Sequence, residues 1–426
     1  LLAEGYIYSI PKSGYYVSDL SGIPVHQTEY TSETYEAEEQ GTDSRTAKAG
    51  DKVLLTGGEN AFIADFTSNQ TEHAAFPFSI WNKTMRAVMN DYQEEMMINP
   101  PCGGVMELRK SISSYLKEFC AMYVRPEQII IGAGTEYLYS ILIQLLGRNV
   151  CYGVENPGYP KIAKIYRSMG VKYEYIDLDE EGTSAKKLEE KKVDIMHISP
   201  SHHFPTGMVM PISKRYELLG WVTREKERYI IEDDYDSELR LAGKPIPSLQ
   251  SIDVSGKVIY INTFAKTLCS TVRISYMVLP EALAEKYYRE LSFYSCTVSN
   301  FEQYTLAAFM NAGAFEKHIN RLRNYYQHKR DLILSTFLRE PLGKYITISE
   351  EDSGVHFLMH VNTSMSEQEF LLKTRAKGIR LATLSSFYNA EQKDSRYENT
   401  YVMNYSFVNC DRLEYVAQTL YKIIHP

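Results

Sequence analysis

The chain has 426 residues, of which 44% are hydrophobic and 23% are charged, and its formal net charge is −8. Because it is longer than one hydrophobic core usually grows, we expect two or three domains. The acidic balance argues against a basic stripe that grips nucleic acid. Six scattered cysteines without a CxxC pair indicate reduced thiols. With no membrane-length apolar run and no secretion signal at the start, we expect a cytoplasmic protein without a membrane partner.

The N-terminal part differs in composition from the rest of the chain. Two short β-forming runs, at 5–10 and 14–17, are separated by a Pro-Lys-Ser turn and predict a small hairpin within residues 1–18. Residues 19–58 are poor in apolar periodicity and rich in Thr, Ser and Glu. We therefore interpret them as an exposed linker.

Beyond residue 105, helical patterns alternate with short β-branched runs. The predicted helices are at 105–119, 135–147 and 212–226, with further helical patterns over 302–338. The predicted strands are at 128–132, 150–154, 194–198, 229–233, 257–262 and 272–279. This alternation indicates an α/β fold with a mainly parallel sheet covered on both faces. We assign residues 59–300 to this large domain and residues 301–426 to a smaller α+β domain.

Polar and small residues follow the ends of several predicted strands, where ligands of parallel sheets bind. They are Gly134, Thr135, Tyr159, His203, Asp233, Tyr235, Thr263 and Lys266. A pyridoxal phosphate site requires such a set. A lysine amine forms an imine with the cofactor aldehyde, and a carboxylate pairs with the pyridine nitrogen. Free amides at a helix N-terminus hold the phosphate.

Each of these residues also has an ordinary interpretation. A lysine after a strand is usually solvated, an Asp pair often caps a helix, and a tyrosine after Pro-Gly often packs in a loop. His202 and His203 suggest a metal, but no cysteine or acid stands nearby at ligand spacing, so we predict none. The order and the intervals of the whole set favour the cofactor site, because the ordinary interpretations would all have to coincide.

Several motifs are specific enough to suggest a family. Residues 231–240 read IEDDYDSELR, residues 262–268 read NTFAKTL, and residues 200–207 read PSHHFPTG. With these motifs, nearly the whole chain resembles the MocR/GabR-type transcription regulators. Those proteins fuse a winged helix-turn-helix domain to a domain similar to the fold-type I aminotransferases. The resemblance implies that fold, pyridoxal 5′-phosphate as the cofactor, and Lys266 as the lysine that holds it.

The resemblance also implies roles for the other motif residues. Asp233 would meet the pyridine nitrogen, Tyr235 would meet the ring hydroxyl with His203 beside it, and Tyr159 would stack on the ring. The phosphate would be held by Gly134, Thr135, Thr263 and Arg273. Residues 1–18 resemble the remnant of the wing. Because the recognition helix is absent, we expect a truncated regulator that contacts DNA only through a missing N-terminal domain. A homodimer is implied as well.

Three positions depart from the pattern of active aminotransferases. Val402 stands where an arginine that clamps the substrate carboxylate is expected, so a strong, directional interaction is lost. Phe204 replaces the asparagine common before Pro-Thr-Gly, and residues 98–101 lack a tyrosine that relatives often supply to the neighbouring subunit. The candidate cations for an effector are Lys161, Arg380 and Arg396.

The first hypothesis is an effector-binding and dimerisation domain of a regulator. Lys266 holds the cofactor as an imine, an amino-group effector displaces it to form an external imine, and domain closure follows. Amino acids or dipeptides such as γ-aminobutyrate and D-alanyl-D-alanine, or the cofactor itself, fit the family, although the lost clamp argues against a short amino acid. The alternatives are a working aminotransferase, in which Lys266, Asp233 and Tyr235 transfer protons, and a dimerisation scaffold without cofactor.

Overall fold

The computed structural model describes residues 7–10, 14–17, 62–243, 246–389 and 397–425. It divides into two units, residues 1–59 and residues 60–426. In the first unit, strands β1 (Ile7–Ile10) and β2 (Gly14–Val17) pair antiparallel, which confirms the two strands of the predicted hairpin. The linker predicted at 19–58 lies outside the described residues.

The second unit contains a seven-stranded sheet in the order β4-β10-β9-β8-β7-β5-β6. Its strands are β4 (Ile129–Ala133), β5 (Cys151–Asn156), β6 (Lys172–Asp177), β7 (Ile195–Ile198), β8 (Tyr229–Asp233), β9 (Val258–Thr263) and β10 (Ile274–Val278). All neighbours are parallel except at β10, which runs against both β4 and β9. The mainly parallel sheet is as predicted, whereas β6 and the reversed direction of β10 were not predicted.

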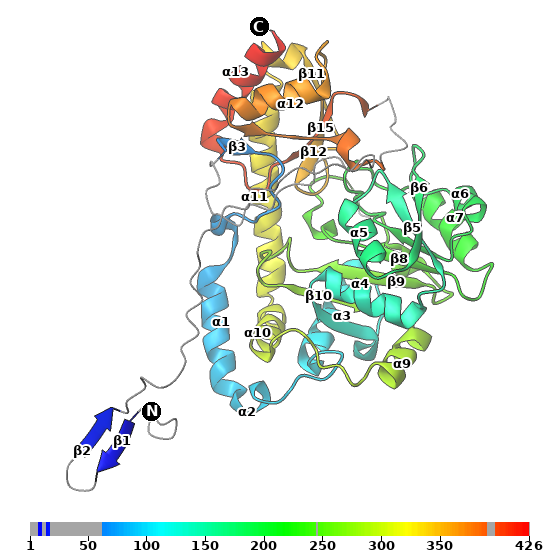
Figure 1. Ribbon diagram of the computed structural model, residues 1–426, viewed down its shortest axis with the longest axis vertical. Helices are drawn as coiled ribbons and strands as arrows, with labels where there is room; N and C mark the ends of the chain where they lie inside the picture. Colours follow the sequence, from blue (N-terminus) through cyan, green and yellow to red (C-terminus); the bar gives the residue numbers. More distant parts are fainter. Residues whose placement is uncertain (1–6, 11–13, 18–61, 244–245, 390–396, 426) are drawn as a thin grey trace, which may run out of the picture. The chain divides into compact units, whose positions relative to one another are not determined.

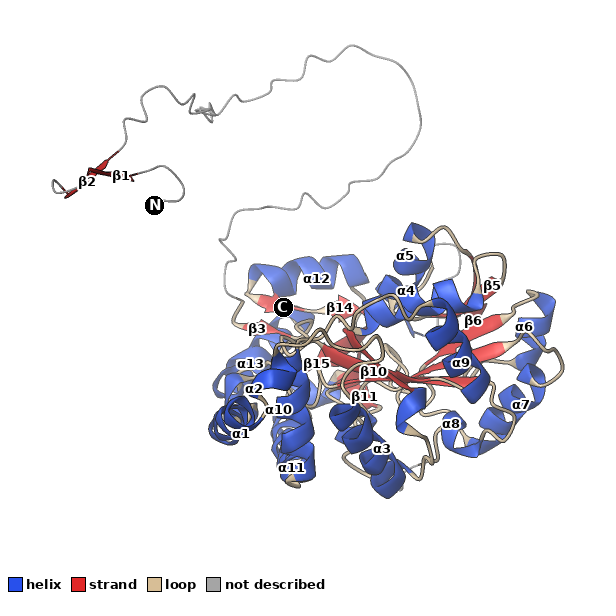
Figure 2. Ribbon diagram, turned by 90° about the horizontal axis from the view of Figure 1, so that it is seen from below, coloured by secondary structure: helices blue, strands red, loops and turns tan. Residues whose placement is uncertain are grey.

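Helices cover both faces of this sheet because its central strands are apolar on both sides (Figure 2). One face packs against α4 (Thr135–Leu146), α5 (Pro160–Ser168) and α9 (Glu281–Glu290). The other packs against α3 (Met106–Cys120), α6 (Ala185–Glu190), α7 (Ile212–Val222), α8 (Leu249–Ile252) and α10 (Asn300–Asn311). Helices α1 (Phe78–Asp91) and α2 (Gln93–Met96) join the second group through Trp81 and Met96. No described helix is both long enough and apolar enough to cross a membrane.

A second, antiparallel sheet has the order β11-β12-β15-β14. Its strands are β11 (Ile346–Ser349), β12 (His356–Val361), β14 (Ala382–Thr383) and β15 (Thr400–Asn404). One face packs on α12 (Glu367–Ala376), α13 (Leu413–Ile424) and α11 (Ala314–Phe337). This is the predicted α+β part of the chain, and we call it the small half.

Helix α11 packs into both halves, and Figure 1 shows it running from α10 to the small sheet. Its first turns add Phe315 and Ile319 to the core of the large sheet, and its later turns pack in the small half. The start of the body also joins the small half, where β3 (Ala64–Asp65) pairs in parallel with β13 (Ile379–Arg380). The domain limits at 59–300 and 301–426 remain predictions.

Residues 350–354 of the small half lie against the segment that follows β8. The amides of Leu241 and Ala242 donate to the carbonyl of Asp352, and the Gly354 amide donates to the Leu239 carbonyl. Gly354 has a φ of +66°, and a Cβ there would lie 2.2 Å from the His202 ring and 2.5 Å from an Asp236 oxygen. Glycine is therefore required twice over, for its backbone conformation and for the close approach.

We predict that Gly354→Ala lowers the free energy of unfolding by about 2–5 kcal/mol, because backbone strain adds to overlap with two buried side chains. Gly313→Ala is the matched control, since Gly313 has a φ of +63° and the nearest atom to an added Cβ is 3.9 Å away. The control is expected to lose only about 1–2 kcal/mol. Urea unfolding of the cofactor-free chain measures both values, and equal losses would contradict the overlap.

Candidate functional site

The predicted site residues gather at one edge of the large sheet. Strands β4, β5, β7, β8 and β9 run in one direction, so their carboxyl ends share that edge. Thr135 begins α4 after β4, Asp233 ends β8, and Thr263 ends β9, three positions before Lys266. Arg273 precedes β10 and reaches the same edge because that strand is reversed.

Asp233 is only 7% exposed, and its two oxygens have different surroundings. Oδ2 accepts a hydrogen bond from the Tyr139 hydroxyl and lies 3.5 Å from His197 Nε2. Oδ1 is buried and has no hydrogen-bond partner in the described structure. A buried acceptor without a partner is costly, so this oxygen marks the place where a ligand donor would fit.

The partners of Asp233 were missed by the sequence reasoning. His197 comes from β7, and its Nδ1 lies 2.9 Å from the hydroxyl of Tyr166 on α5. Burial, followed by nearby charges that include Asp233, raises the pKa of both Tyr139 and Tyr166 well above the ordinary value. Both hydroxyls therefore keep their protons. A histidine within the apolar run of β7 was the one available sequence signal.

Lys266 is partly buried, and its amine donates to Oδ1 of Asn69, which comes from the start of the body. Burial lowers the pKa of this amine to about 8, although the charge of Asp236 acts to raise it. A neutral amine is the form that attacks a carbonyl carbon. The lysine therefore has the protonation behaviour that an imine-forming residue needs.

Tyr235 lies beside a histidine that was not predicted to contact it. Its hydroxyl is 3.2 Å from Nδ1 of His202, which is also 2.9 Å and 3.0 Å from the two oxygens of Asp236. Burial, then Asp236, raises the pKa of Tyr235 well above its ordinary value. The predicted His203 instead contacts Thr206 Oγ1 at 2.7 Å. Burial, then the charge of His202, lowers the pKa of His203 to about 3, so it is neutral.

We call the N-terminus of α4 together with Arg273 the anion-binding corner, after the phosphate site that is predicted there. Gly134 precedes the helix with a φ of +91°, and a Cβ there would lie 2.1 Å from the Arg273 guanidinium. Helix N-terminal amides and a guanidinium are both donors for phosphate. Arg273 Nη2 lies 2.5 Å from Glu136 Oε2 in this structure. Thr263 Oγ1 accepts from the Ala265 amide at 3.2 Å and from the Ser275 hydroxyl at 2.8 Å.

The described candidate effector cations pair with acids of the protein. The Lys161 amine pairs with Glu136, whose pKa it lowers together with Arg273 against the opposing effect of burial. Arg380 lies 3.4 Å from the carboxylate of Asp65. Arg396 lies outside the described residues. Both described candidates thus already have acidic partners.

Tyr159 follows β5 and is 46% exposed, with its ring edge-on to Phe204 at a centroid distance of 5.9 Å.

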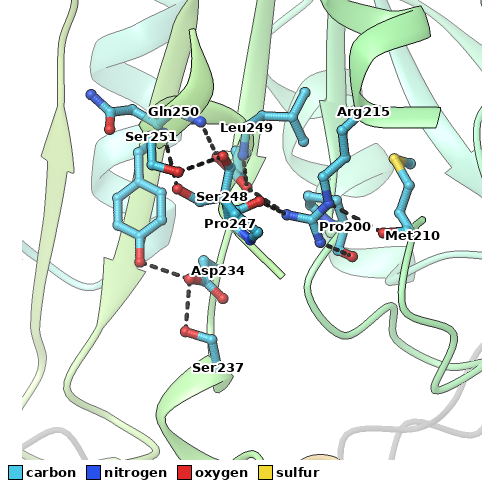
Figure 3. Close-up of polar contacts among 12 residues, drawn as sticks. Pro200, Met210, Arg215, Asp234, Ser237, Pro247, Ser248, Leu249, Gln250 and Ser251 are labelled. Atoms are coloured by element: carbon cyan, nitrogen blue, oxygen red, sulfur yellow. Dashed lines mark hydrogen bonds and ion pairs between the residues drawn. The ribbon is translucent and has the colours of Figure 1, made fainter. Parts of the chain in front are cut away.

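The loop that carries Phe204 is supported by hydrogen bonds from the buried side chain of Arg215 (Figure 3). This guanidinium donates to the carbonyls of Pro200 and Met210 at either end of the loop, and to Pro247. The Arg215 side chain therefore fixes the backbone of the loop after β7 at both of its ends.

Asp234, next to Asp233, makes its hydrogen bonds inside the protein, beside the edge of the large sheet where the site lies. It accepts hydrogen bonds of 2.7 Å from the hydroxyls of Tyr260 and Ser237, the second of which Figure 3 labels. Burial raises the pKa of Asp234 to about 6 in spite of these donors. Asp234 is thus committed to internal contacts, which leaves Asp233 to face a ligand.

The family model described as "Aminotransferase class I and II" matches residues 63–396. The uncharacterized HTH-type transcriptional regulator YdeL of Bacillus subtilis is 36% identical, over 91% of this chain and 80% of its own length. The probable rhizopine catabolism regulatory protein MocR of Rhizobium meliloti is 29% identical, over 90% and 77%. The chain belongs to the MocR-type regulators. Their aminotransferase-like domain shares its fold with the solved structure of Pyrococcus horikoshii kynurenine aminotransferase. The two superpose with a TM-score of 0.72 and 22% sequence identity, over 86% of this chain and 91% of the aminotransferase chain.

The cofactor of this MocR-type domain is pyridoxal 5′-phosphate. Three features of the described residues fit it. The open oxygen of Asp233 suits a protonated pyridine nitrogen, the anion-binding corner suits a phosphate, and the amine of Lys266 has a lowered pKa. The roles of the individual residues stay predictions.

We predict that Tyr139→Phe lowers the free energy of unfolding by about 1.5–3 kcal/mol, because a hydrogen bond to a buried carboxylate is lost. Tyr137→Phe is the control. It removes a hydroxyl from the same helix that has no hydrogen-bond partner in the described structure. The control is expected to be near neutral in urea unfolding, and an equally small loss in both variants would argue against the Asp233 contact.

We also predict how cofactor capture depends on pH. Because the pKa of Lys266 is about 8, the reactive neutral amine forms as pH rises through 8, well below the ordinary value of 10.5. The rate at which cofactor-free protein acquires its visible absorbance band should rise with a midpoint near pH 8. Asp236→Asn should move that midpoint lower, since it removes the charge that raises the lysine pKa. A midpoint near 10.5 in both proteins would refute the burial argument.

Proposed function

We propose that residues 60–426 sense an amino-group effector through the cofactor held at Lys266, and that they regulate transcription as part of a MocR-type protein. When bound, pyridoxal phosphate supplies an aldehyde that condenses with amines and a ring that withdraws electrons. The protein's own part is to hold that ring and to present the Lys266 amine to it. The observation that carries the proposal is the buried, open oxygen of Asp233 at the sheet edge shared with Lys266.

Sensing is favoured over turnover by what surrounds the site. Val402, at the position of the expected carboxylate clamp, lies buried in an apolar cluster with Leu358 and Leu384. Without a directional clamp, a substrate is not held in one orientation for repeated proton transfer. Binding and release of an amine need no such precision. The set of Lys266, Asp233 and Tyr235 still supports slow transamination as a second candidate function.

DNA binding and dimerisation complete the proposal. The relatives are named HTH-type regulators, and we propose that a helix-turn-helix segment, not this acidic body, contacts DNA. We propose a homodimer on the same grounds of kinship. Effector binding would change the relation between the two halves, since Gly354 of the small half lies so close to the site residues His202 and Asp236 that an added Cβ would overlap both.

The test is a spectral titration of the full, cofactor-loaded chain with primary amines. We expect a visible absorbance band that shifts saturably with amine and that is absent in Lys266→Ala. Lys164→Ala, an exposed lysine on α5, should behave as the unmodified chain. Steady conversion of an amino donor and a keto acid by the purified protein would instead support the aminotransferase. No band in the unmodified chain would support the cofactor-free scaffold.

A further inference from the structure

One face of the small sheet is turned toward Lys266. In β12 and β15, His356 is opposite Asn404 and Leu358 is opposite Val402. The intervening residues Phe357, Met359, Tyr401 and Met403 lie in the core of the small half. Because side chains alternate along a strand, the other four form a strip on the opposite face. We call His356, Leu358, Val402 and Asn404 the β12–β15 strip.

The polar end of the strip meets the lysine. The Asn404 amide donates to Asn69 Oδ1 at 3.3 Å, and the Lys266 amine donates to the same oxygen. His356 lies 4.6 Å from His202, ring to ring, and its Nε2 is buried without a hydrogen-bond partner in the described structure. Burial, followed by the charges of His202 and Lys266, lowers the pKa of His356 well below its ordinary value. The polar end of the strip is therefore uncharged.

The other end of the strip is apolar. Val402 is 3% exposed and Leu358 5%, and both pack with Leu384. Phe204, Phe387 and Tyr397 are only partly buried against this cluster. Residues two apart on a strand are separated by about 7 Å, so an amine substituent of a few carbon atoms spans the distance from Asn404 to Val402.

Aromatic rings join the two ends of the strip. Phe204 lies 5.3 Å from the His356 ring, 5.1 Å from Phe387 and 5.9 Å from Tyr159. The segment that carries Phe387 is held to the large half by its carbonyl, which accepts from the Gly158 amide at 3.3 Å. The strip is thus covered by rings from both halves.

The four residues of the strip offer no positive charge to a carboxylate, since none of them is a cation. Of the cations described at the site, Lys161 and Arg273 both pair with Glu136. A carboxylate placed among apolar side chains without a charged partner is strongly disfavoured. An uncharged apolar group in the same place is favoured.

We propose that the effector is a primary amine whose substituent is apolar and carries no carboxylate, with that substituent lying along the β12–β15 strip. This inference rests on the proposed function, since the amine must reach the cofactor at Lys266. It differs from the amino-acid and dipeptide effectors that the family resemblance suggests, because those carry carboxylates.

The test compares matched pairs of amines on the full, cofactor-loaded chain. The pairs are 2-phenylethylamine with phenylalanine, and butylamine with γ-aminobutyrate. Dissociation constants come from the shift of the cofactor band and are divided by the constants for the same amines with free cofactor. We expect the amine without a carboxylate to bind at least about 10-fold more tightly in each pair, since the carboxylate of the other member would lose its hydration among apolar side chains without a charged partner. Tighter binding of the carboxylated members would overturn the inference.

Variants locate the effect on the strip. Val402→Arg should reverse the preference within each pair, whereas Val402→Ile should leave it unchanged. If Val402→Arg does not fold, Phe387→Ala provides the test at a partly buried position. It should weaken 2-phenylethylamine several-fold and leave methylamine, which is too short to reach the ring, unchanged. Equal weakening of both amines would contradict the placement of the substituent.

The two proposals fail in different ways. If no amine shifts the cofactor band of the unmodified chain, sensing at Lys266 is wrong. If amines shift the band but the carboxylated members of both pairs bind more tightly, sensing stands and only the apolar effector is wrong.

Discussion

The site is organised around one buried carboxylate that is half satisfied. Asp233 is held at Oδ2 by a tyrosine from α4 and lies beside a histidine from β7, while Oδ1 has no partner in the described structure. A ligand that donates to a buried oxygen of this kind stabilises the folded protein. The two neighbouring acids, Glu232 and Asp234, differ from Asp233 in this respect. Glu232 accepts from two backbone amides, and Oδ2 of Asp234 accepts from two hydroxyls, so both acids already have partners within the protein.

The two halves of the body meet at this site, and neither completes it alone. The large sheet contributes the lysine, the acid and the anion-binding corner. The small half contributes Gly354, which leaves no room for a Cβ beside His202 and Asp236, and the uncharged His356, whose ring lies 4.6 Å from that of His202. Since α11 belongs to both cores, its rigidity links the positions of these groups. A ligand that changed the spacing at the sheet edge would therefore act on the relation between the halves, as the proposed function requires.

Much of this arrangement follows from local sequence patterns. Apolar runs such as Ile129-Ile130-Ile131 predict buried strands, and the residues just after them fall at the shared edge because parallel strands end together. The motifs around Asp233 and Lys266 are each continuous in the sequence, so they can be recognised without the structure. Tyr139, Tyr166, His202 and Asn69 were not predicted as contacts, because their roles arise only when separate elements pack. The reversal of β10, which brings Arg273 to the edge, likewise depends on pairing that no local pattern encodes.

Asn69 gives this geometry a further meaning. It accepts from the Lys266 amine and from Asn404, yet it lies only nine positions beyond residue 60, where the body begins. An amine committed to a new covalent bond no longer donates in the same way, so the chemistry of the lysine would first change the contacts of Asn69. Because Asn404 donates to the same oxygen, a change at the lysine also reaches the small half through a single shared acceptor.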